Sequence, residues 1–380
     1  MRGRRYARLG VISVVLCSGI GCTDEGRTDV STNESLVEIF AQTLGRISDE
    51  GEAYVIGSLR DGALDDAGRV YLLDTMAGRV LTFDSAGSHQ GAAGQFGEGP
   101  GELSTTTTAL AVDRNGSPMV VDIGRRAVLR VADGTDGGIV QPLPRTSGIE
   151  RSWQISDDTT ISVEVVGRGS ARLVRWMGSS ADTLFQASWP AFEGADGAPV
   201  EELLAPQFLW DARSSTATFL YSRMDSLIVE TDGARRRIRV PGPVPATIDD
   251  QRHLEEMWRQ FQEARGVPQQ VVEMIVVNLP DALPRVADLH LDSATGFVWL
   301  SIVPDETQLR PGRWLVDGLE HLPVSELRGV SLSGGSDVSL ALSEPSRVLD
   351  AFAGRILLGH HDTLGRPSAS IIRPILDQGM

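Results

Sequence analysis

An internal repeat constrains the fold of this chain more than any other feature. The segment LDDAGRVYLLD at Leu64 to Asp74 aligns with VDRNGSPMVVD at Val112 to Asp122, and the two copies lie 48 positions apart. Each copy consists of an aspartate, a turn with glycine, an apolar strand, a second aspartate, a second turn and a second apolar strand. Aspartate and glycine supply the turn conformations, and alternating apolar residues fill one buried face. The repeated unit is therefore predicted to be a β-hairpin.

The first half of this unit returns near the C-terminus, as LDSATGFVWLSI from Leu291 and as LDAFAGRILLGHHD from Leu349. Weaker echoes occur at Asp157 to Val166 and at Asp211 to Ser222. Short strands that repeat at intervals near fifty residues are typical of propeller blades rather than of solenoid coils. The chain after residue 35 has room for about six or seven such units. Because one stretch is not β-like, we predict an all-β, six-bladed β-propeller with one inserted helix.

That stretch covers about residues 247–266 and has the pattern of an amphipathic helix. Thr247 can cap the helix, and Gly266 and Pro268 end it. Large apolar residues fall between these ends at helical spacing, at Leu254, Met257, Trp258 and Phe261. We expect this apolar stripe to pack onto a face of the propeller, with a partner-binding helix as the alternative.

Residues 1–21 have the order of a signal peptide. Four arginines precede the apolar run Leu9 to Leu16, which is too short to span a bilayer, and small residues then lead to Cys22. This order resembles the bacterial lipobox, and the resemblance implies that Cys22 becomes the lipidated first residue. The alternative is an ordinary secretory signal. That alternative leaves Cys22 with an unpaired thiol in an oxidising compartment, because the other cysteine, Cys17, lies within the signal.

The polar segment 22–35 is predicted to be a flexible tether, and the folded body to span residues 36–380. We expect an exported protein of the bacterial cell envelope, periplasmic or surface-facing, that meets the membrane through its lipid anchor alone. Removal of the four signal arginines changes the net charge from −16 to −20, which argues against binding to nucleic acid or to anionic lipids. The sequence contains no lysine, so Schiff-base chemistry and a P-loop are excluded.

The repeat layout, the segment GEGPGEL from Gly97 and the closing pattern VLDAFAGRILLGHHDTLGRPSASIIRPI resemble the six-bladed β-propeller lipoproteins with a TolB-like or NHL-like fold. The resemblance covers roughly residues 45–376. It implies that a strand near the N-terminus, at Glu38 to Ile47 or at Tyr54 to Ser58, completes the last blade and leaves no free sheet edge. Biochemical activity is generally unassigned in that family.

The GEGPGEL segment is its most distinctive motif, formed around Gly97, Gly99, Pro100, Gly101 and Glu102. Three glycines and one proline in seven residues predict a tight irregular turn in which side chains would clash. The alternative is an anion site made of backbone N–H groups, which the two glutamates of the motif would oppose. We interpret the motif as structural.

No constellation of catalytic, cofactor-binding or metal-binding residues is evident. The chain has no G-x-S-x-G motif and has three asparagines, which are too few for the Ca²⁺ site of the gluconolactonase type. Among the histidines, His360 and His361 adjoin, but neighbours in a strand point to opposite faces. His290 lies between two leucines and is interpreted as facing a blade surface. Arg125 and Arg126 are interpreted as solvated partners of nearby carboxylates.

The predicted function is a non-enzymatic binding module for a protein, peptide or glycan ligand, without a cofactor. The alternative is a metal-dependent hydrolase or lyase of the lactonase-like propeller type. Three or more carboxylates and carbonyls that converge on a central channel would favour the alternative.

Overall fold

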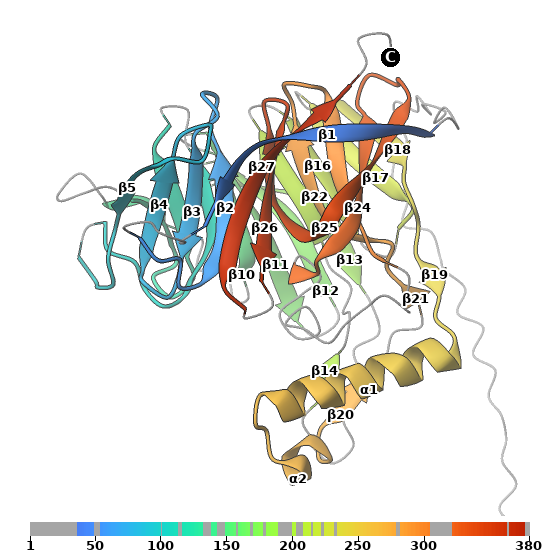
Figure 1. Ribbon diagram of the computed structural model, residues 1–380. Coiled ribbons are helices and arrows are strands. Elements are labelled where there is room, and N and C mark those ends of the chain that lie inside the picture. Colours follow the sequence, from blue (N-terminus) through green and yellow to red (C-terminus); the bar gives the residue numbers. More distant parts are fainter. Residues whose placement is uncertain are drawn as a thin grey trace, which may run out of the picture.

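The structure is a computed structural model that is nearly all β, with 27 strands and two helices among the described residues (Figure 1). It describes residues 36–48, 54–99, 101–112, 116–131, 138–142, 149–156, 159–167, 170–177, 180–188, 200–202, 208–213, 216–221, 224–231, 234–278, 282–304, 321–362 and 365–376.

Four sheets each contain four antiparallel strands in chain order. The first two hold the two full copies of the repeat: β2 (Leu59–Leu64), β3 (Val70–Asp74), β4 (Arg79–Phe83) and β5 (His89–Ala93), then β6 (Thr107–Val112), β7 (Pro118–Asp122), β8 (Ala127–Arg130) and β9 (Gly138–Pro142). The next two are β10 (Ile149–Ser156), β11 (Thr159–Gly167), β12 (Ser170–Met177) and β13 (Ser180–Ser188), then β15 (Phe208–Arg213), β16 (Thr216–Tyr221), β17 (Ser226–Thr231) and β18 (Ala234–Arg239).

A fifth, seven-stranded sheet combines the N-terminal strand with the C-terminal strands, in the order β1-β27-β26-β25-β24-β23-β22. Its strands are β1 (Leu36–Ile47), β22 (Val286–Asp292), β23 (Phe297–Ile302), β24 (Val324–Ser331), β25 (Asp337–Phe352), β26 (Arg355–His361) and β27 (Pro367–Ile375). The first part of the long strand β25 pairs with β24, and its last part pairs with β26. One strand therefore belongs to two successive groups of strands.

The two predicted hairpins are confirmed, as β3–β4 and β7–β8. The glycine turn of the repeat lies within four further hairpins, β2–β3, β6–β7, β22–β23 and β25–β26. Each of their turns contains a glycine with φ between 72° and 78°, a conformation that side chains rarely adopt. These glycines are Gly68, Gly116, Gly296 and Gly354. The repeated glycine thus marks a turn position that needs a positive φ.

The N-terminal strand covers the edge of the last strand of the chain. β1 pairs antiparallel with β27 from Phe40 opposite Ile375 to Ile47 opposite Ala369, and its first four residues pair parallel with β25 (Figure 1). Of the two candidate closing segments, the one at Glu38 to Ile47 is therefore confirmed. The Tyr54 to Ser58 segment is not a strand, and Tyr54 packs into a hydrophobic cluster instead.

The first strand of each group contacts the first strand of the next. β2 lies against β6, β6 against β10, β10 against β15, β15 against β22, β22 against β25, and β25 against β2. These six strands are called the inner strands below. Because the circuit returns to its starting point, their facing side chains are brought together from distant parts of the sequence.

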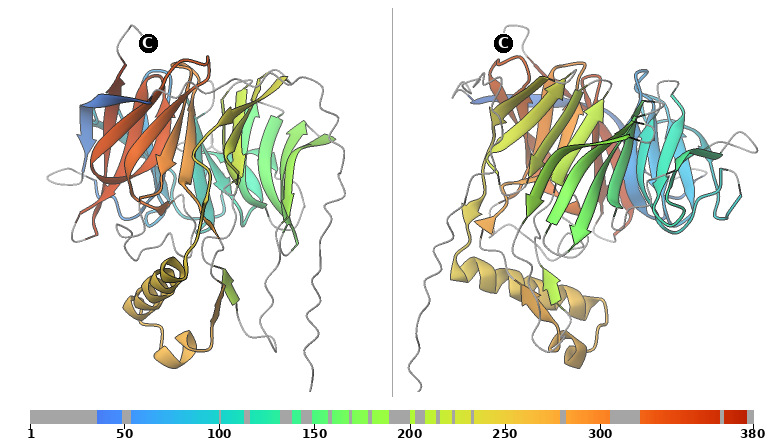
Figure 2. Two further views of the ribbon diagram at one scale, coloured as in Figure 1. Left: turned by 90° about the vertical axis from the view of Figure 1, so that its right-hand side faces the viewer. Right: turned by 180° about the vertical axis from the view of Figure 1, so that it is seen from behind.

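A separate group of elements, called the arm below, stands off one end of the sheets (Figures 1 and 2). It consists of β19 (Val244–Pro245), α1 (Ile248–Ala264), α2 (Gln269–Val272), β20 (Val276–Asn278), β21 (Ala282–Leu283) and β14 (Val200–Glu202). β14 pairs parallel with β20, and β19 pairs antiparallel with β21.

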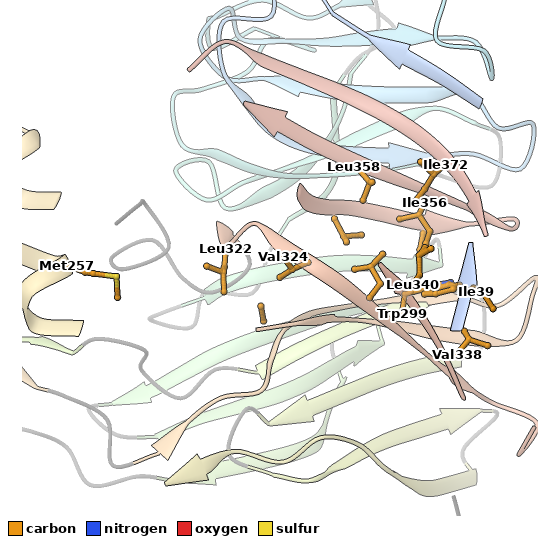
Figure 3. Close-up of a cluster of buried hydrophobic side chains, with 14 of the residues drawn as sticks. Ile39, Met257, Trp299, Leu322, Val324, Val338, Leu340, Ile356, Leu358 and Ile372 are labelled. Atoms are coloured by element: carbon orange, nitrogen blue, oxygen red, sulfur yellow. The ribbon is translucent and has the colours of Figure 1, made fainter. Parts of the chain in front are cut away.

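The predicted helix is confirmed, with its cap. The Thr247 hydroxyl accepts a hydrogen bond from the Asp250 N–H at 3.1 Å, and the Asp250 carboxylate accepts one from the Thr247 N–H at 2.6 Å. Leu254, Met257 and Trp258 are buried and belong to one cluster with sheet residues. Figure 3 shows Leu322 between Met257 and the rest of that cluster. None of the helices among the described residues has the length and apolar character needed to span a bilayer.

Candidate ion-binding site among the inner strands

Three buried side chains from three inner strands meet at one point. They are Asp211 on β15, His290 on β22 and Asp350 on β25, and one potential ligand atom of each lies within 4.8 Å of the others. The exposed fractions of these residues are 8%, 6% and 4%. Because polar groups are rarely buried without a role in bonding, this cluster is the strongest candidate for a functional site among the described residues.

Strand alternation explains why His290 reaches this point. Its neighbours Leu289 and Leu291 are buried in a cluster with Leu209 and Leu220 of the preceding sheet. Successive residues of a strand point to opposite faces, so the histidine points away from that cluster. His290 is buried on that opposite face, where its imidazole lies close to Asp211 and Asp350 of two other inner strands.

The two aspartates join adjacent inner strands through backbone hydrogen bonds. Asp350 Oδ2 accepts from Leu64 N on β2 at 2.7 Å, and Asp211 Oδ2 accepts from Leu291 N on β22 at 2.8 Å. A third aspartate does the same one sheet further on, since Asp61 Oδ2 accepts from Leu110 N on β6 at 2.8 Å. These bonds fix the carboxylates and hold neighbouring strands in register.

The imidazole of His290 lies in an acidic environment. Its Nε2 is 3.5 Å from Asp288 Oδ2, which is too long for a strong hydrogen bond. Among the described residues, this buried nitrogen has no hydrogen-bond partner. Burial by itself lowers the pKa of His290, but the carboxylates of Asp288, Asp211 and Asp350 outweigh burial and raise the pKa above its ordinary value.

This arrangement can hold a positive charge in one of two forms. A protonated imidazole neutralises part of the charge of the surrounding carboxylates. Alternatively, a metal ion can bind to a neutral imidazole and two carboxylates, a donor set that suits Zn²⁺ and other first-row transition ions better than Ca²⁺. Catalysis by such an ion would also need a coordination position open to substrate.

The GEGPGEL motif lies between β5 and β6, outside the Asp211–His290–Asp350 cluster, and is stabilised by a hydrogen bond within the motif. Glu102 Oε2 accepts from Gly99 N at 2.7 Å, and this bond is the main cause of the lowered pKa of Glu102. A Cβ atom on Gly97 would lie 1.8 Å from the same oxygen. The carboxylate thus occupies a backbone donor that a bound anion would need, which agrees with a structural role. Gly101 has a φ of 74°, while Pro100 lies outside the described residues.

Arg125, in the turn between β7 and β8, forms hydrogen bonds to the GEGPGEL loop. Its guanidinium donates to the carbonyl groups of Gly97, Gly99 and Glu102, and it lies 3.6 Å from Asp122. The side chain is 19% exposed, so it is not the solvated ion pair expected from the sequence. Cys22 lies outside the described residues, and its lipidation stays a prediction.

Comparison with known proteins identifies the type of fold. No family model and no curated sequence matches the chain. A solved structure of a DUF4221 family member from Bacteroides vulgatus is 8% identical, with a TM-score of 0.51, and the alignment covers 90% of this chain and 99% of that one. A protein of Bacteroides fragilis described as exported is 11% identical, with a TM-score of 0.47 and coverage of 92% and 98%.

A gluconolactonase from Xanthomonas campestris is 12% identical, with a TM-score of 0.41 and coverage of 90% and 98%. Identities this low show the fold alone, and they do not assign the chain to a family. The structural neighbours are proteins of the propeller type, and this chain shares its nearly all-β fold with the DUF4221 family member.

Proposed function

We propose that the protein is an exported, lipid-anchored, six-bladed β-propeller that acts as a non-enzymatic binding module. The closed circuit of six inner strands supports the number of blades. In this proposal β25 is shared by the last two blades, and β1 is the outermost strand of the last one. Cys22 anchors the chain, and residues 23–35 form its tether to the membrane.

The arm is the observation that carries the proposal of a binding role. It stands off one end of the sheets (Figure 2). It also presents large apolar side chains to solvent. Ile248 is 75% exposed and Met274 is 61% exposed, and Val271 and Val244 are also exposed. Exposed apolar groups gathered on one projecting element are typical of surfaces that bind another molecule.

Site-specific photo-crosslinking tests this role. A photoreactive phenylalanine derivative is placed at Ile248 or Met274 in the full-length protein, in the bacterium that produces it. We expect a discrete crosslinked product from both positions. Met76 is the matched control, since it is 72% exposed and apolar but lies in a turn between β3 and β4. Equal products from Met76, or none from the arm, would contradict a binding role of the arm.

The alternative function is a metal-dependent hydrolase or lyase. Its specific support is the convergence of Asp211, His290 and Asp350 between the inner strands. Against it stands the burial of all three side chains, each less than one-tenth exposed, because a catalytic ion needs access for substrate. Hydrolysis of lactones and aryl esters by the purified protein, with and without Zn²⁺ or Ca²⁺, separates the two functions. Turnover that is lost in His290→Ala would displace the binding module as the function.

A further inference from the structure

We propose that Asp211, His290 and Asp350 bind one divalent first-row transition-metal ion, such as Zn²⁺, between the inner strands. The three ligand atoms already lie within 4.8 Å of one another. They come from β15, β22 and β25, which lie against one another in the order of the circuit. The proposal goes beyond the binding role of the arm and does not depend on it.

The second observation is the state of the imidazole. The His290 side chain is 8% exposed, and among the residues that the structure describes its Nε2 atom makes no well-formed hydrogen bond, with Asp288 Oδ2 at 3.5 Å. A buried polar atom without a partner is unfavourable and calls for an additional ligand. A metal ion is such a ligand, because it takes the lone pair of a neutral imidazole nitrogen.

The donor set selects the class of ion. One imidazole and two carboxylates are ligands of Zn²⁺ and of its first-row neighbours, whereas Ca²⁺ and Mg²⁺ prefer oxygen alone. Donors at about 2.0–2.2 Å from a tetrahedral ion lie about 3.4 Å apart. The three ligand atoms, now within 4.8 Å of one another, therefore need to approach by about 1.4 Å at most.

Hydrogen bonds from backbone N–H groups orient the carboxylates of Asp211 and Asp350, the two proposed metal ligands. The Leu64 N–H and the Ala351 N–H donate to Asp350, at 2.7 and 2.8 Å, and the Leu291 N–H donates to Asp211 at 2.8 Å. Such bonds orient carboxylate ligands in metal sites. An ion held here would link three inner strands and bind the folded state preferentially.

Metal titration of the full-length protein tests the site, with an affinity tag that contains no histidine. The protein is stripped with EDTA, dialysed, and titrated with Zn²⁺, Mn²⁺ or Ca²⁺ at pH 8 by calorimetry and by thermal unfolding. We expect one Zn²⁺ per chain and a Tm that rises by several degrees in excess Zn²⁺, because a ligand of the folded state stabilises it by mass action. Ca²⁺ should change the Tm by less than one degree.

Single substitutions locate the site. His290→Gln and Asp211→Asn should each abolish the Zn²⁺-dependent rise in Tm. Asp61→Asn is the matched control, because Asp61 also accepts a backbone hydrogen bond from the next inner strand but lies outside the cluster. His361→Gln controls for binding at an exposed histidine, and both controls should keep the rise. A rise that survives His290→Gln, or that His361→Gln removes, would overturn the proposal.

A spectroscopic measurement on the unaltered protein covers the case in which the substitutions prevent folding. Co²⁺ replaces Zn²⁺ in sites of this type, and its visible absorption reports the coordination geometry. We expect d–d bands that saturate at one equivalent of Co²⁺ and disappear when one equivalent of Zn²⁺ is added. Absence of these bands, together with no calorimetric binding of Zn²⁺, would show that no transition-metal site exists here.

Discussion

Asp350 on β25 accepts a hydrogen bond of 2.7 Å from the backbone N–H of Leu64 on β2, although the two residues are 286 positions apart. The same carboxylate accepts the Ala351 N–H at 2.8 Å. Asp350 is 4% exposed, so water cannot take the place of its carboxylate as the acceptor of either hydrogen bond. This aspartate therefore fastens the last inner strand to the first.

Removal of that carboxylate should destabilise the fold. Asp350→Ala leaves two buried N–H groups without this acceptor, at a cost of about 1–3 kcal/mol each. We expect the free energy of unfolding to fall by about 2–5 kcal/mol in urea titrations with EDTA present. Asp362→Ala is the control, since Asp362 also accepts a backbone N–H, from Arg366, but is exposed. Similar losses in both variants would show that burial of the Asp350 bonds is unimportant.

A second buried aspartate should make stability depend on pH. Burial alone would raise the pKa of Asp122, but hydrogen bonds from Arg125 N, Ser104 N and the Thr106 hydroxyl outweigh it, and the pKa is lowered from 3.8. A lowered pKa means that the charged form stabilises the fold above about pH 4 and that this contribution is lost as the pH falls through the folded-state value.

Asp122→Asn should therefore be less stable than the unaltered protein at pH 7, by about 1–3 kcal/mol. The difference should shrink as the pH falls below about 4, where the carboxylate becomes protonated. Urea unfolding at a series of pH values measures it. Asp66→Asn, in an exposed position of a neighbouring turn, should show no such trend. A difference that is constant from pH 7 to pH 3 would refute the role of the Asp122 charge.

Lipid anchoring at Cys22 is a prediction from the signal sequence. Mass spectrometry of the N-terminal peptide, after membrane fractionation, should show a diacylated or triacylated Cys22. Cys22→Ala should move the protein to the soluble fraction, because a single protein body without its acyl chains has no hydrophobic anchor. An unmodified Cys22 in membrane-associated protein would contradict the prediction.

Local patterns were sufficient to predict much of the fold. The repeat in the sequence predicted the hairpins β3–β4 and β7–β8, because aspartate and glycine mark the turns on either side of an apolar strand. The helix was predictable because Thr247 and Asp250 form a reciprocal cap. The parallel pairing of β14 with β20 was not predictable, since Val200–Glu202 and Val276–Asn278 are three residues each and carry no pattern of their own.

The candidate ion site was missed because sequence alignment and strand register differ at one repeat. The sequence aligned Asp350 with the turn aspartates Asp65 and Asp292. In the structure, a register shift precedes Asp350 as it precedes Asp61 and Asp288, and each of these three accepts the N–H of its own next residue. Asp350 is therefore the equivalent of those inner-strand aspartates. The turn of β25–β26 is shorter, and this shortening concealed the relationship.

Closure of the ring by the two ends of the chain is the central claim, and a disulfide crosslink tests it most directly. Gln42 on β1 faces Arg373 on β27, and both residues are exposed. The pair Gln42→Cys and Arg373→Cys, with Cys17 and Cys22 replaced by alanine, should oxidise to an intramolecular disulfide that raises the Tm. Each single-cysteine variant should form none. Failure of the pair to crosslink in folded protein, or a crosslink that lowers the Tm, would contradict closure by β1 and β27.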